Sequence, residues 1–524
     1  MKKLLFLACF VAFAAQAALF PPKPTFPKPD QIIVSGPTKG TRIYNGNVGL
    51  TNAFWNLTNS DTMLIGPGTY TVKAYKNTSG YGAGGLQCGR QTATVPIHDI
   101  LIEGYSAIIA TTNYGTIMSF FGPSNIAIRG LSFVGDLVNV TNYTNGVDFT
   151  PEGAVFFQTN YSGGPMENLW INQCSFYAMP DQAISFMWPG AFESRVTDCY
   201  FDTIGRTNNI NGYTADGACI SGIQYGGIIT GNKATNVVHF FEWDGSIAGV
   251  ARRSSSIIVQ GNRVERLFKY GIFFAAASSG CSVQDVKVLD NFLSYHAAWQ
   301  EVTPQVSAGI FLGGSVSNCL VRGNTVAGVL NAAGNSMAVL DSAGNNKDVV
   351  ITDNTFRDST ITGIRIDSTT TKGAERITVS RNQFISVAWP LYIQSQNILI
   401  SDNTFKGWLT AVPAIYVNAA DASNIICRGN ILVPTNTGSF ALHLEADYPG
   451  CTLEDTVVQG TGLTAMIEAG TTVSNLFYRG EGAAAPTVGT KVGSQYRLTT
   501  SAHEPFYIQT NSMGGDGWRP VDLN

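Results

Sequence analysis

The sequence predicts an all-β solenoid in which short parallel strands wind into a β-helix. Between Gly226 and Val433, a unit recurs in which an apolar residue is followed three positions later by Asn and two positions further on by another apolar residue. Apolar and polar residues alternate within each unit, which is the period of a β-strand. The chain also has 56 glycines and only 13% charged residues, as stacked strands with tight corners require. The recurring asparagines, 21 to 33 residues apart, are Asn232, Asn262, Asn291, Asn324, Asn354, Asn382, Asn403 and Asn430.

Each unit also contains a second alternating run after its Asn. Self-similarity at such a period indicates a solenoid, in which one unit cannot bury its apolar face until its neighbours stack on it. Two or three short strands per turn, wound in parallel, would make one coil of the solenoid. The second runs are Gly-Ile-Phe-Phe at 271–274, Gly-Ile-Phe-Leu at 309–312, Gly-Ile-Arg-Ile at 363–366, Pro-Leu-Tyr-Ile at 390–393 and Ala-Ile-Tyr-Val at 414–417.

The recurrent Asn has a mechanical role in such a stack. Side-chain amides about 4.8 Å apart can hydrogen-bond to one another along the axis, and Asn tolerates the left-handed bends at which a coil turns a corner. From about Asp61 to Tyr478 the chain resembles the pectate-lyase-like superfamily of right-handed parallel β-helices. The resemblance implies that fold, but it fixes no activity, because the fold carries many functions.

The N-terminal residues predict export. Lys2 and Lys3 precede an apolar run from Leu4 to Ala15, and Ala15-Gln16-Ala17 is a small-x-small cleavage site. The run is too short to span a bilayer, and no later segment reaches that length. We therefore expect residues 1–17 to be a signal peptide and the mature protein to be secreted, either extracellular or periplasmic.

The ends of the solenoid are expected to be capped. Residues 18–58 combine a Pro-rich spacer with a segment that should cover the first coil, because a solenoid end exposes unpaired strand edges. Residues 59–478 should form the β-helix as one long domain, since a solenoid grows without widening. The repeat fades after Tyr478, so residues 479–524 are expected to form a C-terminal cap or small appendage.

Charge and cysteine content narrow the choice of partners. A net charge of −4 gives no general attraction to nucleic acid or to an anionic membrane. None of the nine cysteines stands in a Cys-x-x-Cys pair or at metal-finger spacing. Cys174 and Cys199 occupy the ladder position on two consecutive coils, and we expect stacked free thiols there, with a disulfide after export as the alternative. The state of assembly stays open.

The connections between strands are longer in the N-terminal half than from Asn318 to Gly450. Long loops on one side of a rigid stack form the walls of a groove, and binding residues concentrate in such loops. We therefore expect a polysaccharide-binding groove on the N-terminal half. The long connections are 136–164, 202–218, 242–253 and 294–306.

Four ionisable residues are expected to form a column in this groove. Asp181, Arg206, His239 and Lys269 each lie seven residues after a ladder position on successive coils, which would stack them about 4.8 Å apart if the register holds. Such a line suits β-elimination in an acidic polysaccharide. A Lys or His would remove the proton beside a carboxylate, while Arg or a bound cation stabilises the developing charge. The alternative is a row of solvated turn residues.

Hydrolysis of a glycosidic bond would instead need two carboxylates. Thr144-Asn145-Gly146-Val147-Asp148 and Asp181-Gln182-Ala183-Ile184 resemble two polygalacturonase motifs, although Asn145 and Gln182 replace acids of that family and no Gly-His-Gly follows at suitable spacing. Gly363-Ile364-Arg365-Ile366 resembles its Arg-Ile-Lys motif without the Lys. The candidate carboxylates are Asp181, Asp202, Asp216, Glu242 and Asp244.

A further stretch, Phe241-Glu242-Trp243-Asp244-Gly245, is similar to a motif of β-helix alginate and chondroitin lyases, with Arg252 and Arg253 just downstream. This similarity implies catalytic roles for Glu242 and Asp244 and substrate binding by Arg252. Aromatic residues in or beside the long connections would stack on sugar rings or pack a loop onto the coil. These aromatic residues are Trp188, Tyr213, Trp243, Tyr295 and Trp299.

No cofactor is assigned with certainty, and no residue is assigned as a metal ligand. The loop from Asp136 to Glu152 offers oxygen ligands suited to Ca²⁺, with a solvated polar loop as the alternative. The favoured function is a secreted lyase that cleaves an acidic polysaccharide by β-elimination. A glycoside hydrolase and a non-catalytic glycan-binding adhesin or tail-fibre-like protein are the alternatives.

Overall fold

A computed structural model of the chain describes the backbone from residue 27 to residue 521, with internal gaps, and describes side chains as far as residue 459. Several strand residues are described by their backbone alone, among them 336–340 and Asp244. The gaps are 75–84, 89–95, 112–114, 137–152, 159–165, 187–190, 206–216, 245–252, 276–281, 297–307, 330–335, 341–345, 368–374, 409–411, 419–421, 436–438, 447, 460–462, 470–476, 483–494, 499–505 and 510–517.

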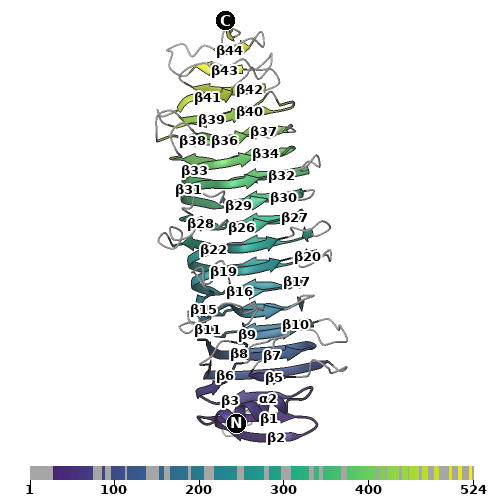
Figure 1. Cartoon of the computed structure of the whole chain (residues 1–524). Helices are drawn as coiled ribbons and strands as arrows, with labels where there is room; N and C mark the ends of the chain where they lie inside the picture. The colour runs from purple at the N-terminus through teal and green to yellow at the C-terminus, as the bar shows by residue number, and fades with distance from the viewer. Residues whose placement is uncertain are drawn as a thin grey trace, which may run out of the picture.

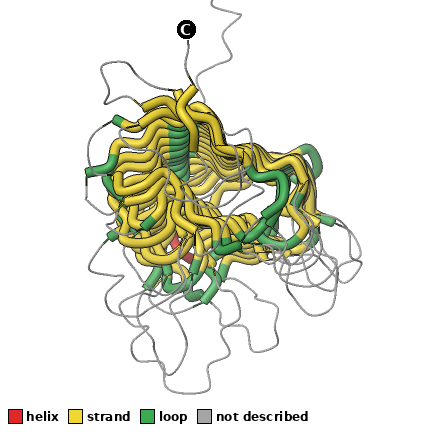
Figure 2. Tube along the Cα trace, turned by 90° about the horizontal axis from the view of Figure 1, so that it is seen from above, coloured by secondary structure: helices red, strands yellow, loops and turns green. Residues whose placement is uncertain are grey.

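The strands wind into a tall column of stacked coils, with the N-terminal and C-terminal ends of the chain at opposite ends (Figure 1). Seen along the axis, successive coils superimpose around a common interior (Figure 2). Neighbouring coils pair through parallel strands, for example Ile229 with Val259 and Val259 with Val288. The expected all-β, right-handed parallel β-helix is confirmed.

Each coil has three faces. The first face precedes the ladder position and contains β3 (Thr62–Ile65), the start of β6 (Ile97–Thr111) and of β8 (Pro123–Val134), β10 (Met166–Asn172), β14 (Arg195–Thr197), β18 (Ile228–Thr230), β21 (Ile258–Gln260), β24 (Lys287–Leu289), β27 (Ser315–Arg322), β30 (Lys347–Thr352), β32 (Glu375–Ser380), β34 (Ile398–Ser401), β37 (Ile425–Arg428), β40 (Thr452–Val458) and β42 (Phe477–Gly482). Short strands lead into it: β13 (Ala191–Phe192), β17 (Ile223–Tyr225), β20 (Arg253–Ser255) and β23 (Ser282–Gln284).

The second face follows the ladder position. It contains β4 (Gly68–Val72), the ends of β6 and β8, β11 (Ser175–Met179), β15 (Tyr200–Ile204), β25 (Phe292–Tyr295), β28 (Thr325–Ala327), β35 (Thr404–Lys406), β38 (Ile431–Val433), and the first parts of β19 (Lys233–Asp244), β22 (Arg263–Ala275), β31 (Thr355–Ile366) and β33 (Gln383–Ile393). These last four strands bend and continue into the third face.

The third face contains the second alternating run of each unit. Its strands are β5 (Leu86–Cys88), β7 (Met118–Phe121), β9 (Gly153–Gln158), β12 (Gln182–Phe186), β16 (Ala218–Ser221), β26 (Ala308–Leu312), β29 (Ser336–Leu340), β36 (Pro413–Val417), β39 (Ser439–Leu444), β41 (Leu463–Ala469) and the ends of β19, β22, β31 and β33.

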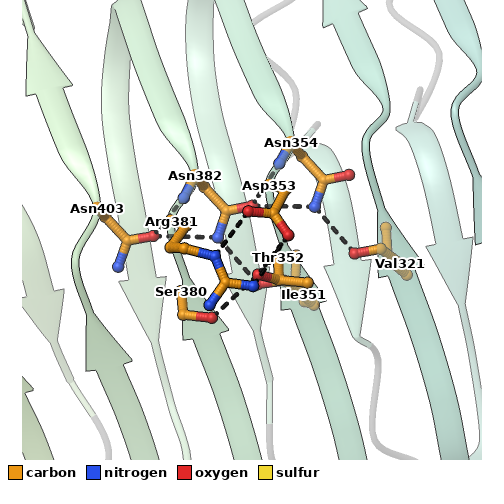
Figure 3. A network of polar contacts seen from close by, with 9 residues as sticks. All are labelled: Val321, Ile351, Thr352, Asp353, Asn354, Ser380, Arg381, Asn382 and Asn403. Carbon is orange, nitrogen blue, oxygen red and sulfur yellow. Dashed lines mark hydrogen bonds and ion pairs between the residues drawn. The ribbon is translucent and has the colours of Figure 1, made fainter.

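A ladder of buried asparagines joins the first face to the second. Nδ2 of Asn354 donates to Oδ1 of Asn382 at 2.9 Å and to the Val321 carbonyl at 3.0 Å, while the Asn354 backbone N–H donates to the same Oδ1 at 3.0 Å (Figure 3). The amide-to-amide bond repeats from Asn232 to Asn430. The ladder residues are at most 1% exposed, so these amides pair backbone groups that would otherwise be buried without partners. The expected ladder is confirmed.

The left-handed bend, however, lies one residue before the ladder Asn, so the expectation that Asn itself takes it is wrong. The preceding residues Asp353 and Arg381 have φ of 57° and 52°, and Gly323 takes the same place before Asn324 with φ of 70°. The side chains at this position face outward and pair with one another. Nε of Arg381 donates to Asp353 at 2.7 Å, as Figure 3 shows.

Two cysteines extend the ladder at its N-terminal end. The backbone N–H of Cys199 donates to Oδ1 of Asn232 at 2.9 Å, and its thiol lies 3.8 Å from the Ile171 carbonyl. Cys174 and Cys199 are buried and free of disulfides, which confirms the expected stacked thiols. Burial raises the pKa of the Cys199 thiol well above its usual value.

Inward-facing side chains fill the interior, and the phenylalanines among them stack. Phe176 lies between Phe133 and Phe201, with ring centroids 5.1 Å away on either side. Phe384 lies in the same way between Phe356 at 5.3 Å and Phe405 at 5.0 Å. Like the asparagines, these rings repeat once per coil, so the vertical alignment of neighbours extends through the core.

At both ends of the column, the parallel stack is followed by strands that pair antiparallel. At the N-terminal end, β1 (Gln31–Gly36) pairs antiparallel with β2 (Gly40–Asn45) and with β3, and α2 (Gly46–Trp55) buries Leu50 and Phe54. At the other end, β43 (Gln495–Leu498) pairs parallel with β42, and β44 (Phe506–Gln509) and β45 (Trp518–Val521) follow antiparallel. The expected signal peptide lies outside the described residues. Among the helices that are described, none is long and apolar enough to cross a membrane.

Candidate functional site

One position of the third face is aligned from coil to coil along the column, and we call this set of residues the outward column. Most members with described side chains are flanked by residues of the buried core, as Glu242 is by Phe241 and Trp243 and Tyr392 is by Leu391 and Ile393. The strand alternation turns these members away from the central core, although Ser119, Phe156, Ser185 and Ser221 are themselves buried. They are Gln87, Ser119, Phe156, Ser185, Ser221, Glu242, Phe273, Phe311, Val339, Arg365, Tyr392, Tyr416, His443 and Glu468.

A histidine and a glutamate pair on this face. Nδ1 of His239 lies 2.8 Å from Oε2 of Glu242, both on β19. His239 is 2% exposed and the Glu242 side chain 21% exposed. In the described part of the chain, the buried Nε2 of His239 has no hydrogen-bond partner. In the tautomer that donates its Nδ1 proton to the carboxylate, the imidazole has a lone pair on Nε2, which suits a proton acceptor.

A tyrosine of the next coil lies against this pair. The ring of Tyr270 meets the imidazole of His239 edge to face, with centroids 5.0 Å apart, and stacks on Phe273 at 4.2 Å. Burial, followed by the nearby Glu242 carboxylate, raises the pKa of Tyr270 to about 12. The phenol is therefore protonated at neutral pH and suits a proton donor. We call His239, Glu242, Tyr270 and Phe273 the His239 cluster.

Polar and apolar groups flank the His239 cluster along the axis. Toward the N-terminal end, the Ser221 hydroxyl donates to Oε1 of Gln182 at 2.6 Å and lies 3.4 Å from the Ser185 hydroxyl. Toward the C-terminal end, Phe311 lies 4.9 Å from Phe273. Ser185 and Ser221 are buried, so the partly exposed groups of this region are the Glu242 carboxylate and the rings of Tyr270, Phe273 and Phe311. A carboxylate beside aromatic rings can bind a sugar unit.

The expected column of four ionisable residues is wrong in register. His239 aligns with Ala218 on one side and Tyr270 on the other. Leu267 pairs with Val237, so β22 has one residue more than β19 at the bend, and Lys269 falls out of line. Lys269 still lies near the cluster, with its Nζ 5.2 Å from the Tyr270 ring. Asp181 is 5% exposed and immediately precedes β12, one position before the residue equivalent to His239.

Two of the aromatic residues expected to meet sugar are turned into the molecule. Trp243 is 3% exposed within the hydrophobic core, because the segment expected as a loop from Glu242 is still strand as far as Asp244. Tyr295 is 7% exposed, and its hydroxyl donates to the Lys269 carbonyl at 3.1 Å. Both therefore pack the coil, and the expectation that they bind substrate is wrong.

The candidate carboxylate Asp202 lies on β15 of the second face, where it accepts from Nδ2 of Asn236 at 3.0 Å. The remaining expected site residues lie outside the described residues, as do the side chain of Asp244 and the expected Ca²⁺ loop beyond Asp136. Their roles stay predictions. In the described part of the chain, no group of three or more His, Cys, Asp or Glu side chains could hold a metal ion. The expected site residues outside it are Trp188, Arg206, Tyr213, Asp216, Arg252 and Trp299.

Sequence reasoning missed most of the outward column, although a signal was present. Phe273, Phe311, Arg365, Tyr392 and Tyr416 are the third residues of the five second runs, and each stands between two core residues. A large aromatic or charged residue at an outward position, repeated on consecutive coils, is the observation that would have found them.

A concave region of about 510 Å³ lies on the first face, away from the His239 cluster. It is lined by Asp285, Lys287, Asn318 and Asp348 among others. Its carboxylates are paired, since Asn318 donates to Asp285 at 2.5 Å and Nη2 of Arg376 donates to Asp348 at 2.8 Å. This polar row stabilises the stack through its paired carboxylates.

Comparisons with known proteins agree with the coil geometry. Residues 207–413 match the family model described as periplasmic copper-binding protein (NosD). The parallel β-helix fold that the expected resemblance implies is confirmed by the paired coils of the structure. A comparison with curated proteins finds no significant match.

Two solved structures illustrate how remote the similarity to known structures is. A mutant tailspike protein of the E. coli bacteriophage HK620, in complex with a pentasaccharide, is 13% identical with a TM-score of 0.48, over 88% of this chain and 79% of that one. A mutant of the periplasmic alginate epimerase AlgG is 12% identical with a TM-score of 0.32, over 80% of this chain and 84% of that one.

Proposed function

We propose that this protein binds a polysaccharide along its third face and cleaves an acidic polysaccharide by β-elimination. The observation that carries the proposal is the 2.8 Å contact between His239 and Glu242 beside the protonated phenol of Tyr270. A proton acceptor and a proton donor on neighbouring coils are the two groups that this reaction needs.

In the proposed reaction, Nε2 of His239 removes the proton on the carbon next to the sugar carboxylate. The electron pair forms a carbon–carbon double bond as the bond to the glycosidic oxygen breaks, and Tyr270 protonates that oxygen as it leaves. Glu242 holds the imidazole in one tautomer and stabilises its positive charge after the proton transfer. The Lys269 ammonium, near the Tyr270 ring, would offset the charge of the substrate carboxylate.

The product decides the reaction class. Elimination leaves an unsaturated uronate that absorbs ultraviolet light, so digestion of alginate, polygalacturonate and chondroitin is followed by absorbance and by new reducing ends. His239→Gln and Tyr270→Phe should each lower turnover by about a hundredfold or more while the polymer still binds. His98→Gln is the matched control, because His98 forms a similar 2.7 Å contact with Asp99 on the first face. Normal turnover in His239→Gln would refute the assignment.

A pure binding protein is the second candidate, and burial of the imidazole favours it. At 2% exposure, His239 must gain access to substrate before it can take a proton. A protein that retains an acidic polymer but releases neither unsaturated products nor reducing ends would be a binder. New reducing ends without unsaturation would instead indicate hydrolysis.

Export is part of the proposal, because a polysaccharide of this class would be met outside the cytoplasm. The basic start and apolar run of residues 1–17 support it. N-terminal sequencing of the protein from periplasm and culture medium should find Ala18 as the first residue. A chain that retains Met1 in either fraction would contradict cleavage at this site.

A further inference from the structure

A second group of side chains lies on the outward column nearer the C-terminal end. Arg365, Tyr392, Tyr416 and His443 come from the third-face parts of β31, β33, β36 and β39, and Glu445 follows β39. We call these five residues the C-terminal cluster. Three steps of the stack separate Arg365 from His443, which is about 14 Å along the axis. A short oligosaccharide can occupy that length.

The aromatic rings of the C-terminal cluster form a continuous row. Tyr416 lies 5.3 Å from Tyr392 and 4.9 Å from His443, with the planes tilted by 32° and 27°. The Arg365 guanidinium lies 5.5 Å from the Tyr392 ring and closes the row on one side. The rings cover much of each other's faces, so a ligand meets mainly their edges and hydroxyls.

Polar groups stand along the same row. The Tyr416 hydroxyl donates to the Glu445 carboxylate, and Nε2 of His443 lies 3.3 Å from the same carboxylate. Nδ2 of Asn418 donates to the Tyr416 hydroxyl at 3.3 Å. The Glu445 side chain is 44% exposed and Arg365 33% exposed, so these groups keep hydrogen-bonding capacity toward solvent.

The charges favour a neutral ligand. Nε of Arg365 donates to Asp367 at 2.8 Å, which offsets the guanidinium. The hydrogen bond from Tyr416 holds the pKa of Glu445 below its usual range, so this carboxylate stays ionised at neutral pH. The positive groups of the cluster lie beside carboxylates, Arg365 beside Asp367 and His443 beside Glu445, so the cluster offers no unpaired positive charge to a sugar carboxylate. Sugar hydroxyls, in contrast, can both donate to Glu445 and accept from Arg365.

We propose that the C-terminal cluster is a second glycan-binding subsite, which takes neutral sugar units through Glu445, Arg365 and the tyrosine hydroxyls. The subsite lies on the same outward column as the His239 cluster, two coils beyond Phe311. The inference rests on the proposed function in that both clusters contact glycan on one face. It adds a neutral class of ligand, bound without cleavage.

The test is electrophoresis of the native full chain in gels that contain a polymer. The neutral probes are galactomannan, mixed-linkage β-glucan and dextran, and the acidic probes are alginate and polygalacturonate. At least one neutral polymer should retard the protein, and Tyr416→Ala and Arg365→Ala should each weaken that retardation by about tenfold. Tyr416→Phe, which keeps the ring stack, separates loss of the hydroxyl from loss of packing and should weaken it less.

Tyr200→Ala is the matched control, because Tyr200 forms an exposed-face aromatic pair with Tyr177, 5.7 Å away on the second face. Its retardation should equal that of the unaltered chain. Absence of retardation by all three neutral polymers, or equal loss in Tyr200→Ala and Tyr416→Ala, would overturn the subsite. Cleavage of acidic polymers by the unaltered chain, followed by ultraviolet absorbance, tests the lyase proposal separately, so failure of the subsite and failure of the lyase proposal give different results.

Discussion

At the scale of single residues, the ladder asparagines form a set of hydrogen bonds that no other side chain of similar size can form. Oδ1 of Asn324 accepts from the backbone N–H and from the side chain of Asn291, at 3.0 and 2.9 Å, while its Nδ2 donates to the Val288 carbonyl at 2.8 Å. All of these groups are buried. Its Nδ2 also donates to Oδ1 of Asn354 at 2.9 Å, so one side chain bonds to groups of both neighbouring coils.

Asn324→Ala should lower the free energy of unfolding by about 3 kcal/mol or more, because several buried donors and acceptors lose their partners together. Asn172→Ala is the control, since Asn172 bonds to Thr197 in a half-exposed position and its loss should cost about 1 kcal/mol or less. Denaturant unfolding followed by circular dichroism measures both. Equal losses would mean that the ladder adds nothing beyond an ordinary surface hydrogen bond.

The two cysteines at the end of the ladder offer the converse change. Cys199→Asn would place an amide where its Nδ2 can donate to Oδ1 of Asn232 and to the Ile171 carbonyl, both of which Cys199 already contacts. The variant should be at least as stable as the unaltered chain, whereas Cys199→Ala should lose about 1 kcal/mol or more by leaving a small cavity. The same denaturation experiment measures both variants. A lower free energy of unfolding for Cys199→Asn than for Cys199→Ala would show that the asparagine ladder cannot extend to position 199.

Tyr270 provides a prediction on pH. Its folded-state pKa of about 12 lies above the usual value near 10, so the folded state holds the phenol proton more tightly than the unfolded chain does. Its contribution to stability is complete below pH 10 and is lost as the pH rises through 12. Alkaline titration of phenolate absorbance should show a late-titrating tyrosine that Tyr270→Phe removes. Glu242→Gln should move this step to lower pH, and an unmoved step would exclude coupling between the two groups.

At the scale of the strands, each element is stabilised by its position in a stack more than by its own sequence. Most strands of the first face contain only three to seven residues, too few to be stable alone. The Phe384 ring lies between Phe356 and Phe405, so its removal takes away the stacking contact of both neighbouring rings.

Phe384→Ala should therefore cost about 3 to 5 kcal/mol, and Phe384→Leu, which keeps most of the volume, clearly less. Because a solenoid is coupled coil to coil, hydrogen exchange should rise mainly in β31, β33 and β35. Uniform acceleration along the whole column would contradict local coupling.

The elements also show what could be predicted from the sequence. The ladder position, the strand period and the stacked thiols depend on local repetition, which a single sequence contains. The register across a bend does not depend on local repetition. Because β22 has one additional residue at the bend, Tyr270 and not Lys269 aligns with His239, and spacing alone could not reveal this. The prediction that Trp243 lies in a loop is wrong for a related reason. The end of a strand depends on pairing with the next coil, and Trp243 pairs with Phe274 there.

At the scale of the whole molecule, the outward column makes one face of a long rod chemically continuous. Vertical alignment repeats each outward position about every 4.8 Å, so groups distant in sequence, such as Glu242 and His443, share one line. A rigid rod with such a face suits a polymer ligand better than a small one. The same alignment would leave an open strand edge at each end of the column if the terminal strands β1, β2 and β43 did not pair there.

The C-terminal edge gives the last prediction. The last coil ends at β42, whose outer edge pairs with β43, and β44 and β45 continue antiparallel from there. A chain that stops after Gly482 would leave β42 unpaired, and an open edge of this kind recruits strands from other molecules. Light scattering after size exclusion should find higher-order species for this truncation. A chain that lacks only residues 510–524 keeps β43 over β42 and should elute like the full chain. If the chain that stops after Gly482 also keeps the full chain's assembly state, the β42 edge is protected by something other than β43.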